Sequence, residues 1–427
     1  MTPWIIFLLL IALLLTGMPI SIALGITVLA FLFFFTTIPI EIVSQRLFTG
    51  LDQFAIMAIP FFILAGSFLT TGGVAKRMVR FAVALVGWMH GGLAVAGVLS
   101  CAFFAAVSGS SPATVVAIGS ILLPAMVQQG YPLKFGVGVL ATAGGLGILI
   151  PPSIVMIIYA VSTNTSVGKL FLAGVVPGLI MAAWLMLVTW YVAKRRGYPT
   201  MPRAGGRELW ESFRGSFWGL ALIVVVVGGI YGGVFTPTEA AAMAAVYAFF
   251  IALFVYKDMK WKDVPGALLE SANMSSMLLY IITNAILFSF LLTSENIPQH
   301  LAQWIIEQGL TPWMFLLFVN VLLFFAGDFM EASSIVLIMA PIFFPVAVKL
   351  GIDPIHLGII MVINMELGMI TPPVGLNLYV ASGLSKLGLT EVTVAAAPWI
   401  LVVTAVLLLV TYLPSLSLWL PRLVYGQ

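Results

Sequence analysis

The sequence predicts an all-α, polytopic membrane protein that contains an internal inverted repeat. Of its 427 residues, 62% are hydrophobic and only 8% are charged, and the mean hydropathy is +1.17. Soluble domains carry about a quarter charged residues, so this chain cannot cover a water-facing surface with charge. In addition, a proline-containing motif occurs twice, and the connector that leads into the first half of this repeat is basic whereas its counterpart in the second half is acidic.

Apolar segments recur along the whole chain. In a bilayer each must be helical, because a helix satisfies its own backbone hydrogen bonds. A transmembrane barrel would instead show alternating segments of about ten residues. No basic region precedes the first apolar segment, so we expect no cleavable signal peptide, and the single cysteine, Cys101, allows no internal disulfide. The segments cover 4–16, 18–36, 52–71, 91–107, 112–126, 135–160, 170–193, 217–235, 238–256, 271–292, 311–327, 334–348, 356–381 and 394–414.

The distribution of Lys and Arg predicts the orientation in the membrane, since cytoplasmic loops carry an excess of both. The densest basic segment lies between Lys194 and Arg214, which we place in the cytoplasm. Alternating spans then place 76–80 and 257–262 inside and Glu295 outside, together with the N-terminus. The basic residues left outside are Arg46, Lys169, Lys349 and Arg422.

Segments 91–107 and 112–126 are separated by only a few small residues, 108–111. The parity of the spans allows either two full crossings or a re-entrant hairpin that returns to the same side. The polar, small-residue tip favours a re-entrant hairpin whose tip is buried in protein or in a water-filled cavity.

The two halves of the chain repeat one pattern. Gly-Ile-Leu-Ile-Pro-Pro at 147–152 recurs as Gly-Met-Ile-Thr-Pro-Pro at 368–373, an offset of 221 residues (372 − 151 = 221). The connector before the first hairpin is basic and its counterpart is acidic, so the halves are predicted to have opposite orientations. Inverted repeats with broken helices are typical of secondary transporters. The same offset pairs Phe103 with Phe324, Phe104 with Phe325, Ala105 with Ala326, Pro124 with Pro345, Gly130 with Gly351 and Leu146 with Leu367.

Each half is predicted to interrupt its helices twice, at 108–112 and 144–152 in the first half and at 327–334 and 366–373 in the second. Proline removes a backbone donor and glycine lets the chain unwind. Freed carbonyls suit Na⁺, and the N-termini of half-helices suit a carboxylate. Kinks that serve packing alone are the alternative, which four symmetric breaks disfavour.

Polar side chains near these breaks are the candidate ligands. Acids within the membrane are costly and are therefore functional by default, with an interhelical hydrogen bond or ion pair as the alternative. Asp328 and Glu331 at the second tip are acids of this kind, as is Glu366. Asn377, a polar amide, is a candidate with less weight. The serines that begin the return helices are expected to cap them and can also contact a ligand. These are Ser110, Ser111, Ser333 and Ser334.

Other polar residues receive structural interpretations. Glu239 follows Pro237 and is expected to be a first-turn acid that the helix dipole favours. The histidines show no metal-ligand spacing, and no phosphate loop, Ser-His-Asp set or zinc motif is present. Hydrolysis of ATP by this chain is therefore not expected. Segments 74–90 and 294–309 are predicted to be amphipathic arms along opposite membrane faces, or else ordinary connecting helices.

The polar tips, the proline pairs, the inverted repeat and the length together resemble the large (M, DctM-like) subunit of tripartite ATP-independent periplasmic (TRAP) transporters. The resemblance covers essentially the whole chain. Its most specific stretches are Ala106–Pro124, Gly144–Pro152, Gly327–Pro345 and Asn364–Asn377.

The resemblance implies Na⁺-coupled secondary uptake of an organic acid anion, such as a C4-dicarboxylate or sialic acid, by an elevator mechanism in the bacterial inner membrane. It implies a small four-helix membrane subunit in a separate chain and a periplasmic binding protein as partners, and neither an organic cofactor nor nucleic acid. The implied divisions are scaffold and arm (1–90), transport-domain half 1 (91–168), scaffold and second arm (169–310), half 2 (311–385) and a C-terminal helix (386–427).

The resemblance also implies site residues. Na⁺ would bind near Ser108, Gly109, Gly144 and Gly147 in the first half, and near Gly327, Asp328, Gly368 and Thr371 in the second. The substrate carboxylate would lie between the tips, near Ser110, Ser111, Ser333, Ser334 and Asn377.

Two other functions remain open at this point. One is a stand-alone Na⁺- or H⁺-coupled dicarboxylate or citrate carrier, which needs no binding protein. The other is an intramembrane hydrolase, such as an aspartyl protease, which needs two facing acids; Asp328, Glu331 and Glu366 could supply a pair. The first half has no matching acid, so we expect a transporter and not an enzyme.

Overall fold

The apolar segments fold as helices in a computed structural model that describes residues 2–36, 38–39 and 41–426. Eight helices in these ranges are long and apolar enough to cross a membrane, or nine if the bent pair Leu133–Leu149 and Ile154–Thr163 is one span. The helices are α1 (Thr2–Leu15), α2 (Ile20–Phe35), α3 (Glu41–Leu51), η1 (Phe54–Met57), α4 (Ala58–Thr71), α5 (Val74–Val86), α6 (Gly92–Ser108), α7 (Ser111–Gln128), α8 (Leu133–Ala143), α9 (Leu146–Leu149), α10 (Ile154–Thr163), α11 (Val167–Arg195), α12 (Gly206–Tyr231), α13 (Pro237–Phe250), η2 (Ile251–Val255), η3 (Trp261–Asp263), α14 (Val264–Ser294), α15 (Ile297–Glu307), α16 (Pro312–Gly327), α17 (Ala332–Lys349), α18 (Pro354–Met369), α19 (Leu376–Ser385), α20 (Leu389–Tyr412) and α21 (Ser415–Tyr425).

Every predicted apolar segment corresponds to one of these helices or to two or three consecutive ones. The predicted starts at 217 and 271 were too late, because α12 begins at Gly206 and α14 at Val264. The extra turns of α12 are polar, and hydrophobicity alone does not reveal a helix that continues beyond the apolar layer, whereas the extra turns of α14 are mostly apolar and contain Pro265 and Gly266. The short helices α3 and α21 were not predicted.

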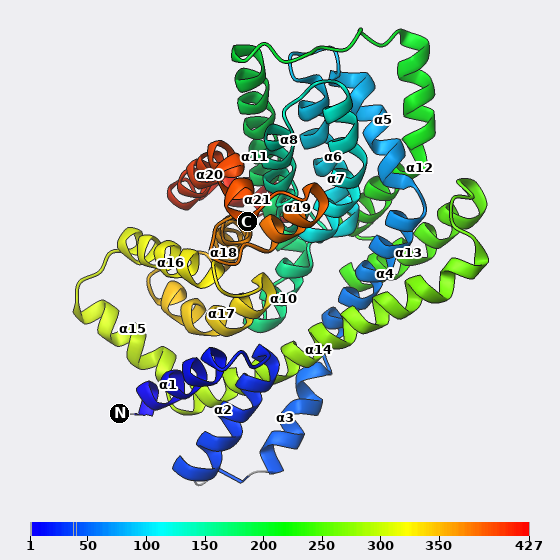
Figure 1. Cartoon of the computed structure of the whole chain (residues 1–427). Helices are drawn as coiled ribbons and strands as arrows, with labels where there is room; N and C mark the ends of the chain where they lie inside the picture. The colour runs from blue at the N-terminus through cyan, green and yellow to red at the C-terminus, as the bar shows by residue number, and fades with distance from the viewer. Residues whose placement is uncertain (1, 37, 40, 427) are drawn as a thin grey trace.

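The repeat is present in the backbone. Helices α7 and α17 begin and end at positions that differ by the same 221 residues, 111 and 332 at the start and 128 and 349 at the end. Both Pro-Pro bonds, Pro151-Pro152 and Pro372-Pro373, are cis. The predicted arms are α5 and α15, which lie at the upper right and at the lower left of Figure 1.

The helices form two packed groups. In the first group α14 packs on α2, α3 and α4, while α13 packs on α4 and α12. The second group contains the hairpins α6–α7 and α16–α17, with α8–α11 and α18–α21. The arms join the groups, because α5 packs on both α12 and α6, and α15 packs on both α14 and α17. Direct contacts between the groups are made by α4 with α6 and by α14 with α17.

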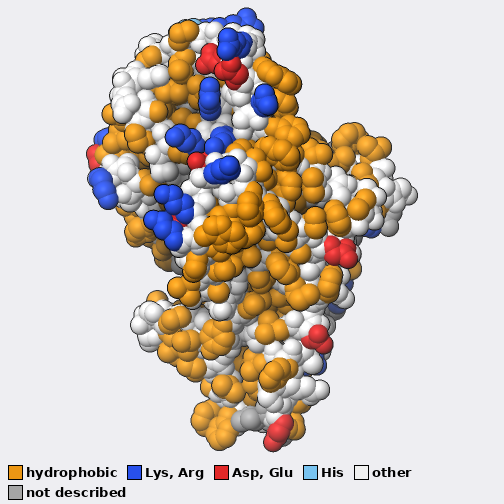
Figure 2. Space-filling model, turned by 90° about the vertical axis from the view of Figure 1, so that its right-hand side faces the viewer, with side chains coloured by type: hydrophobic (Ala, Val, Ile, Leu, Met, Phe, Trp, Pro, Cys, Tyr) orange, Lys and Arg blue, Asp and Glu red, His pale blue; other side chains and the backbone are white. Residues whose placement is uncertain are grey.

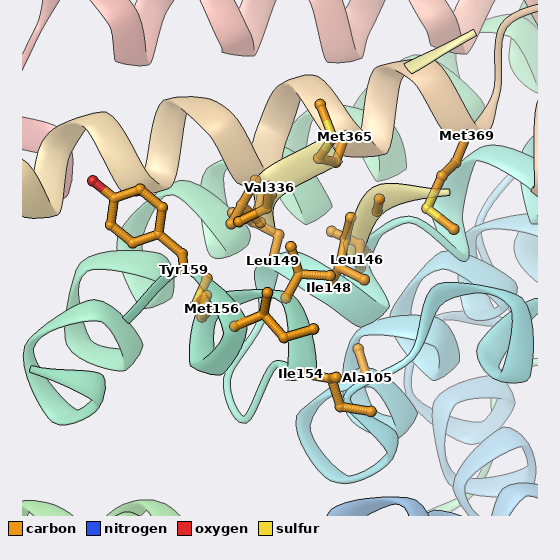
Figure 3. Close-up of a cluster of buried hydrophobic side chains, with 14 of the residues drawn as sticks. Ala105, Leu146, Ile148, Leu149, Ile154, Met156, Tyr159, Val336, Met365 and Met369 are labelled. Carbon is orange, nitrogen blue, oxygen red and sulfur yellow. The ribbon is translucent and has the colours of Figure 1, made fainter. Parts of the chain in front are cut away.

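Within the second group, the two halves of the repeat exchange partners. Helix α10 of the first half packs on α17 of the second, and α19 of the second half packs on α7 of the first. Leu146 and Ile148 of α9 lie beside Met365 and Met369 of α18 in one buried apolar cluster (Figure 3). The two broken helices therefore share one core.

Helices α8, α11 and α20 are held together by close packing and polar contacts. A Cβ atom on Gly138 of α8 would overlap the Ala395 carbonyl of α20, so only glycine allows this approach. Trp399 Nε1 of α20 donates to Thr189 Oγ1 of α11 at 2.9 Å. These contacts fix α11 and α20 to the helices that carry the first break.

Charge is distributed unevenly over the surface. Figure 2 shows Lys and Arg side chains gathered toward the upper end of the molecule, above a broad hydrophobic surface. The basic α11–α12 connection lies at that end in Figure 1. The arrangement agrees with a cytoplasmic upper end, because Lys and Arg favour that side of a bilayer.

The predicted orientation can be tested by cysteine labelling. Cys101 is buried, so a Cys101→Ala background provides a low-labelling parent. We expect Glu295→Cys to react with a membrane-impermeant maleimide added outside spheroplasts, and Arg207→Cys to react only after permeabilisation. Labelling of both from the same side would contradict the inverted arrangement.

Candidate ion and substrate site

The tip of the first hairpin packs directly on the break of its own half. Helix α6 ends at Ser108 and α7 begins at Ser111. Gly109, with φ of +62°, accepts a hydrogen bond from the Ile154 N–H at 3.4 Å. A Cβ atom on Gly147 would lie 2.5 Å from the Ser110 carbonyl oxygen, so only glycine allows this backbone contact.

The tip of the second hairpin makes the matching contact. Helix α16 ends at Gly327 and α17 begins at Ala332. The Val374 N–H donates to the Asp328 carbonyl at 3.0 Å. A Cβ atom on Gly368 would lie 2.6 Å from Gly327 Cα and 2.9 Å from the Gly327 carbonyl oxygen. Each half therefore holds hairpin backbone against a glycine of a broken helix, with Ser110 at the N-cap of α7 in the first half and Gly327 at the end of α16 in the second.

Each tip also uses a backbone carbonyl outside its own helices, because the Gly109 carbonyl accepts from the Ile154 N–H and the Asp328 carbonyl accepts from the Val374 N–H. Carbonyl and carboxylate oxygens are ligands suited to hard cations. Asp328 is 5% exposed, and its Oδ1 has no hydrogen-bond partner among the described residues. The second tip therefore presents a buried acid beside its carbonyl groups.

A polar contact joins the halves at Asn377. Its Nδ2 donates to Ser111 Oγ at 2.7 Å and to the Ala141 carbonyl at 3.4 Å. Both side chains are fully buried. Asn377 thus links α19 of the second half to the start of α7 and the end of α8 in the first.

We expect Asn377→Ala to reduce uptake about tenfold while the protein remains folded. The substitution leaves the buried Ser111 hydroxyl without its donor, a loss of about 1–3 kcal/mol. Initial uptake rates and melting temperatures of purified protein provide the measurement. Asn273→Ala, at an exposed position within α14, is a matched control outside this contact. Equal uptake rates in the two variants would contradict a role for the Asn377 contact.

The caps of the return helices differ from the prediction. Glu331 is the N-cap of α17, where its Oε2 accepts from the Ser334 N–H at 3.2 Å and its Oε1 accepts from Ser333 Oγ at 2.9 Å. Ser110 occupies the N-cap position of α7 without a side-chain cap bond, and Ser111 is the first helical residue. The prediction that these serines cap the helices was wrong, because the extended backbone at Glu331 lets the longer acid reach the free N–H group. Glu239, by contrast, is the expected first-turn acid of α13, and it also forms a capping box with Thr236.

A cavity of about 210 Å³ lies between the first tip and the first helix group. Ser108 and Ser110 line it from the tip, and Ser67, Thr70 and Glu270 line it from α4 and α14. Among the described lining residues, Glu270 is the charged one. The cavity is thus a hydroxyl-rich space between the two helix groups.

Comparison with known proteins identifies the family of this chain. The description "Tripartite ATP-independent periplasmic transporter, DctM component" matches residues 7–416. The chain belongs to the DctM family.

Relatives of this DctM-family chain are named as transporter permeases and not as enzymes. It is 64% identical to the C4-dicarboxylate TRAP transporter large permease protein DctM of Rhodobacter capsulatus, with 99% of each chain covered. It is 55% identical to the protein of that name in Pseudomonas aeruginosa (94% of each). It is 35% identical to the sialic acid TRAP transporter large permease protein SiaM of Vibrio cholerae (97% of this chain, 98% of that one). The chain is thus a multi-pass membrane transporter subunit.

Solved structures show the same fold at low identity. The YdaH transporter of Alcanivorax borkumensis superposes with a TM-score of 0.64 at 16% identity over 87% of each chain. MtrF of Neisseria gonorrhoeae gives 0.61 at 12% identity, over 94% of this chain and 93% of that chain. Both confirm a transporter-type helical architecture.

In this DctM permease, six of the predicted ion-site residues gather at the two tip contacts. They are Ser108, Gly109 and Gly147 at the first and Gly327, Asp328 and Gly368 at the second. The other two lie beside the contacts: Gly144 faces Val115 of α7, and Thr371 Oγ1 donates to the Leu367 carbonyl at 2.7 Å.

Several polar residues near the site were missed. Ser67 and Glu270 line the cavity from helices that the sequence places far from either tip. Asn320 of α16 accepts from Asn364 Nδ2 of α18 at 2.7 Å, and its own Nδ2 donates to Thr411 Oγ1 at 3.0 Å. A single asparagine within an otherwise apolar span was the available signal.

Proposed function

We propose that this permease takes up a C4-dicarboxylate together with Na⁺, using a substrate-binding protein and a small membrane subunit. The observation that carries the proposal is that the hairpin of each half packs its backbone against an equivalent glycine of a broken helix, Ser110 on Gly147 and Gly327 on Gly368. Carbonyl groups at these tips suit a cation, and the nearby N-termini of α7 and α17 suit an anion.

The substrate class is supported by the relatives. Those at 64%, 55% and 48% identity are all named C4-dicarboxylate permeases, whereas the relative named for sialic acid is 35% identical. The small subunit and the binding protein are supported by the family description, which names one component of a tripartite periplasmic transporter. Such a transporter belongs in the inner membrane.

We propose an elevator motion of the second helix group against the first. The cavity at the boundary between the groups supports this proposal, because a substrate bound there faces Ser108 and Ser110 on one side and Ser67 and Glu270 on the other. The arms α5 and α15 contact both the hairpins and neighbouring helices. The close contacts of α8 with α20 add α11, α20 and α21 to the proposed moving unit, which enlarges the divisions expected from the sequence.

Reconstitution tests the proposed function. Proteoliposomes that contain the permease and its small subunit should accumulate radiolabelled succinate when the binding protein and an inward Na⁺ gradient are both supplied. Uptake should cease when K⁺ replaces Na⁺. Uptake that continues without the binding protein would favour the stand-alone carrier, and uptake driven equally by a proton gradient would refute Na⁺ coupling.

A further inference from the structure

Glu366 is a buried acid for which the contacts described above provide no role. It lies in α18, is 0% exposed, and neither Oε1 nor Oε2 has a hydrogen-bond partner among the described residues. The ion pairs of the described residues involve other acids: Asp258, Glu391 and Glu211. An ionised carboxylate without partners costs several kcal/mol in a protein interior, so its charge requires a counter-ion.

The location of Glu366 is set by the repeat. Its equivalent in the first half is Gly145 (366 − 221 = 145). A Cβ atom on Gly145 would overlap the Glu366 side chain, with Glu366 Cδ at 2.6 Å. The acid of one half therefore occupies the space that the missing side chain of the other half leaves free, where the two halves face each other.

The surroundings of Glu366 favour a cation. Helix α8 ends beside it, because the Gly145 N–H bonds to the Thr142 carbonyl and not to Ala141. The Ala141 carbonyl accepts the long 3.4 Å contact from Asn377 Nδ2, and Asn377 Oδ1 has no partner within the described part of the chain. The C-terminal end of an α-helix also carries a partial negative charge that stabilises cations.

The buried side-chain atoms that have no hydrogen-bond partner also favour a cation. Among the described residues none is a nitrogen, and besides two hydroxyls they are amide or carboxylate oxygens, which can only accept. All of these acceptors lie between Asp328 and Asn377 in the second half. A surplus of buried acceptors without donors is the environment that an oxygen-liganded cation requires.

We propose that Glu366 is the charged ligand of a buried Na⁺ ion between the two halves of the repeat, separate from the tip contacts. Asn377 Oδ1 and the carbonyl groups at the end of α8 are the neighbouring oxygen donors. The site rests on the Na⁺ coupling proposed above. It places one coupling ion where the two broken helices meet, so that occupancy stabilises their packing.

Measurement of Na⁺ binding to the purified permease tests this site without any transport assay. Purified permease saturated with ²²Na⁺ should bind one ion more per molecule than Glu366→Gln, which removes the charge and keeps the side-chain shape. Glu211→Gln, at an exposed cytoplasmic ion pair, is the matched control and should bind as the parent does. If Glu366→Gln is not monodisperse, Glu366→Asp should keep the full count with at least tenfold weaker Na⁺ affinity.

Several results would overturn the proposal. An unchanged ²²Na⁺ count in Glu366→Gln would do so, and so would unaltered affinity in Glu366→Asp. A variant that keeps its Na⁺ count but moves one charge fewer per succinate, read from the reversal potential, would identify a proton as the counter-ion instead. If the parent protein binds no Na⁺ at all, the proposed Na⁺ coupling itself fails, which is distinguishable from loss of a single site.

Discussion

Alanine in place of Gly368 is expected to reduce uptake by about 100-fold or more, although the change adds only one methyl group. The new Cβ atom would lie 2.6–2.9 Å from the Cα, carbonyl carbon and carbonyl oxygen of Gly327. All of these are backbone atoms, so relief requires the second tip to move away from α18. Displacements of about 1 Å at a binding site cost on the order of 100-fold, and overpacking adds about 1–3 kcal/mol of destabilisation.

The measurement is the initial rate of Na⁺-driven succinate uptake, normalised to folded protein. Gly383→Ala is the matched control, because Gly383 lies in α19 with nothing within 4 Å of an added Cβ atom. It should transport as the parent does. Normal uptake in Gly368→Ala would show that the close contact of the second tip is not needed for transport.

Replacement of Asp328 by asparagine is expected to reduce uptake about 10- to 100-fold and to weaken the dependence on Na⁺. This is the range found when groups that support a metal ion are removed. Asn keeps the shape and the backbone bond from Asp328 O to Val374 N–H, and removes only the charge at the buried Oδ1. The thermal stability should therefore change little.

Titration of uptake against Na⁺ concentration distinguishes the possibilities. Asp52→Asn, which neutralises an exposed acid at the end of α3, should leave the titration curve unchanged. In Asp328→Asn the half-saturating Na⁺ concentration should rise. An identical curve in Asp328→Asn would remove Asp328 from the coupling site.

The family assignment separates the competing functions. The hydrolase is disfavoured because the relatives are named as permeases and not as enzymes. The structure provides a further reason: Glu331 is occupied as a helix cap with Ser333 and Ser334, so it is not an unengaged partner for Asp328. Whether uptake requires a binding protein decides between the tripartite transporter and the stand-alone carrier.

The fold class and the location of the candidate site could be predicted from the sequence. Spans follow from apolar length, and breaks follow from the glycine and proline clusters at 144–152 and 366–373, since these residues act on the backbone locally. The repeat was readable because the same glycine and proline pattern recurs at one offset in both halves. The assignment of Gly147 and Gly368 to the site came from the resemblance to the family.

Contacts between distant segments could not be predicted in this way. A membrane helix is apolar on nearly all sides, so its sequence does not show which face packs on protein. The exchange of α10 and α19 between the hairpins and the cavity between Ser110 and Glu270 therefore became visible only in three dimensions. The cap at Glu331 depended on the conformation of a single tip residue.

The sequence by itself determined a chain of membrane helices in two related halves, each broken at a tip and at a proline pair, because apolar length, glycine and proline act locally. Only the tertiary structure decided which tip contacts which glycine and that Glu366 meets Gly145 across the repeat. Those contacts depend on how closely helices approach, and that distance is set by the packing of residues far apart in the chain.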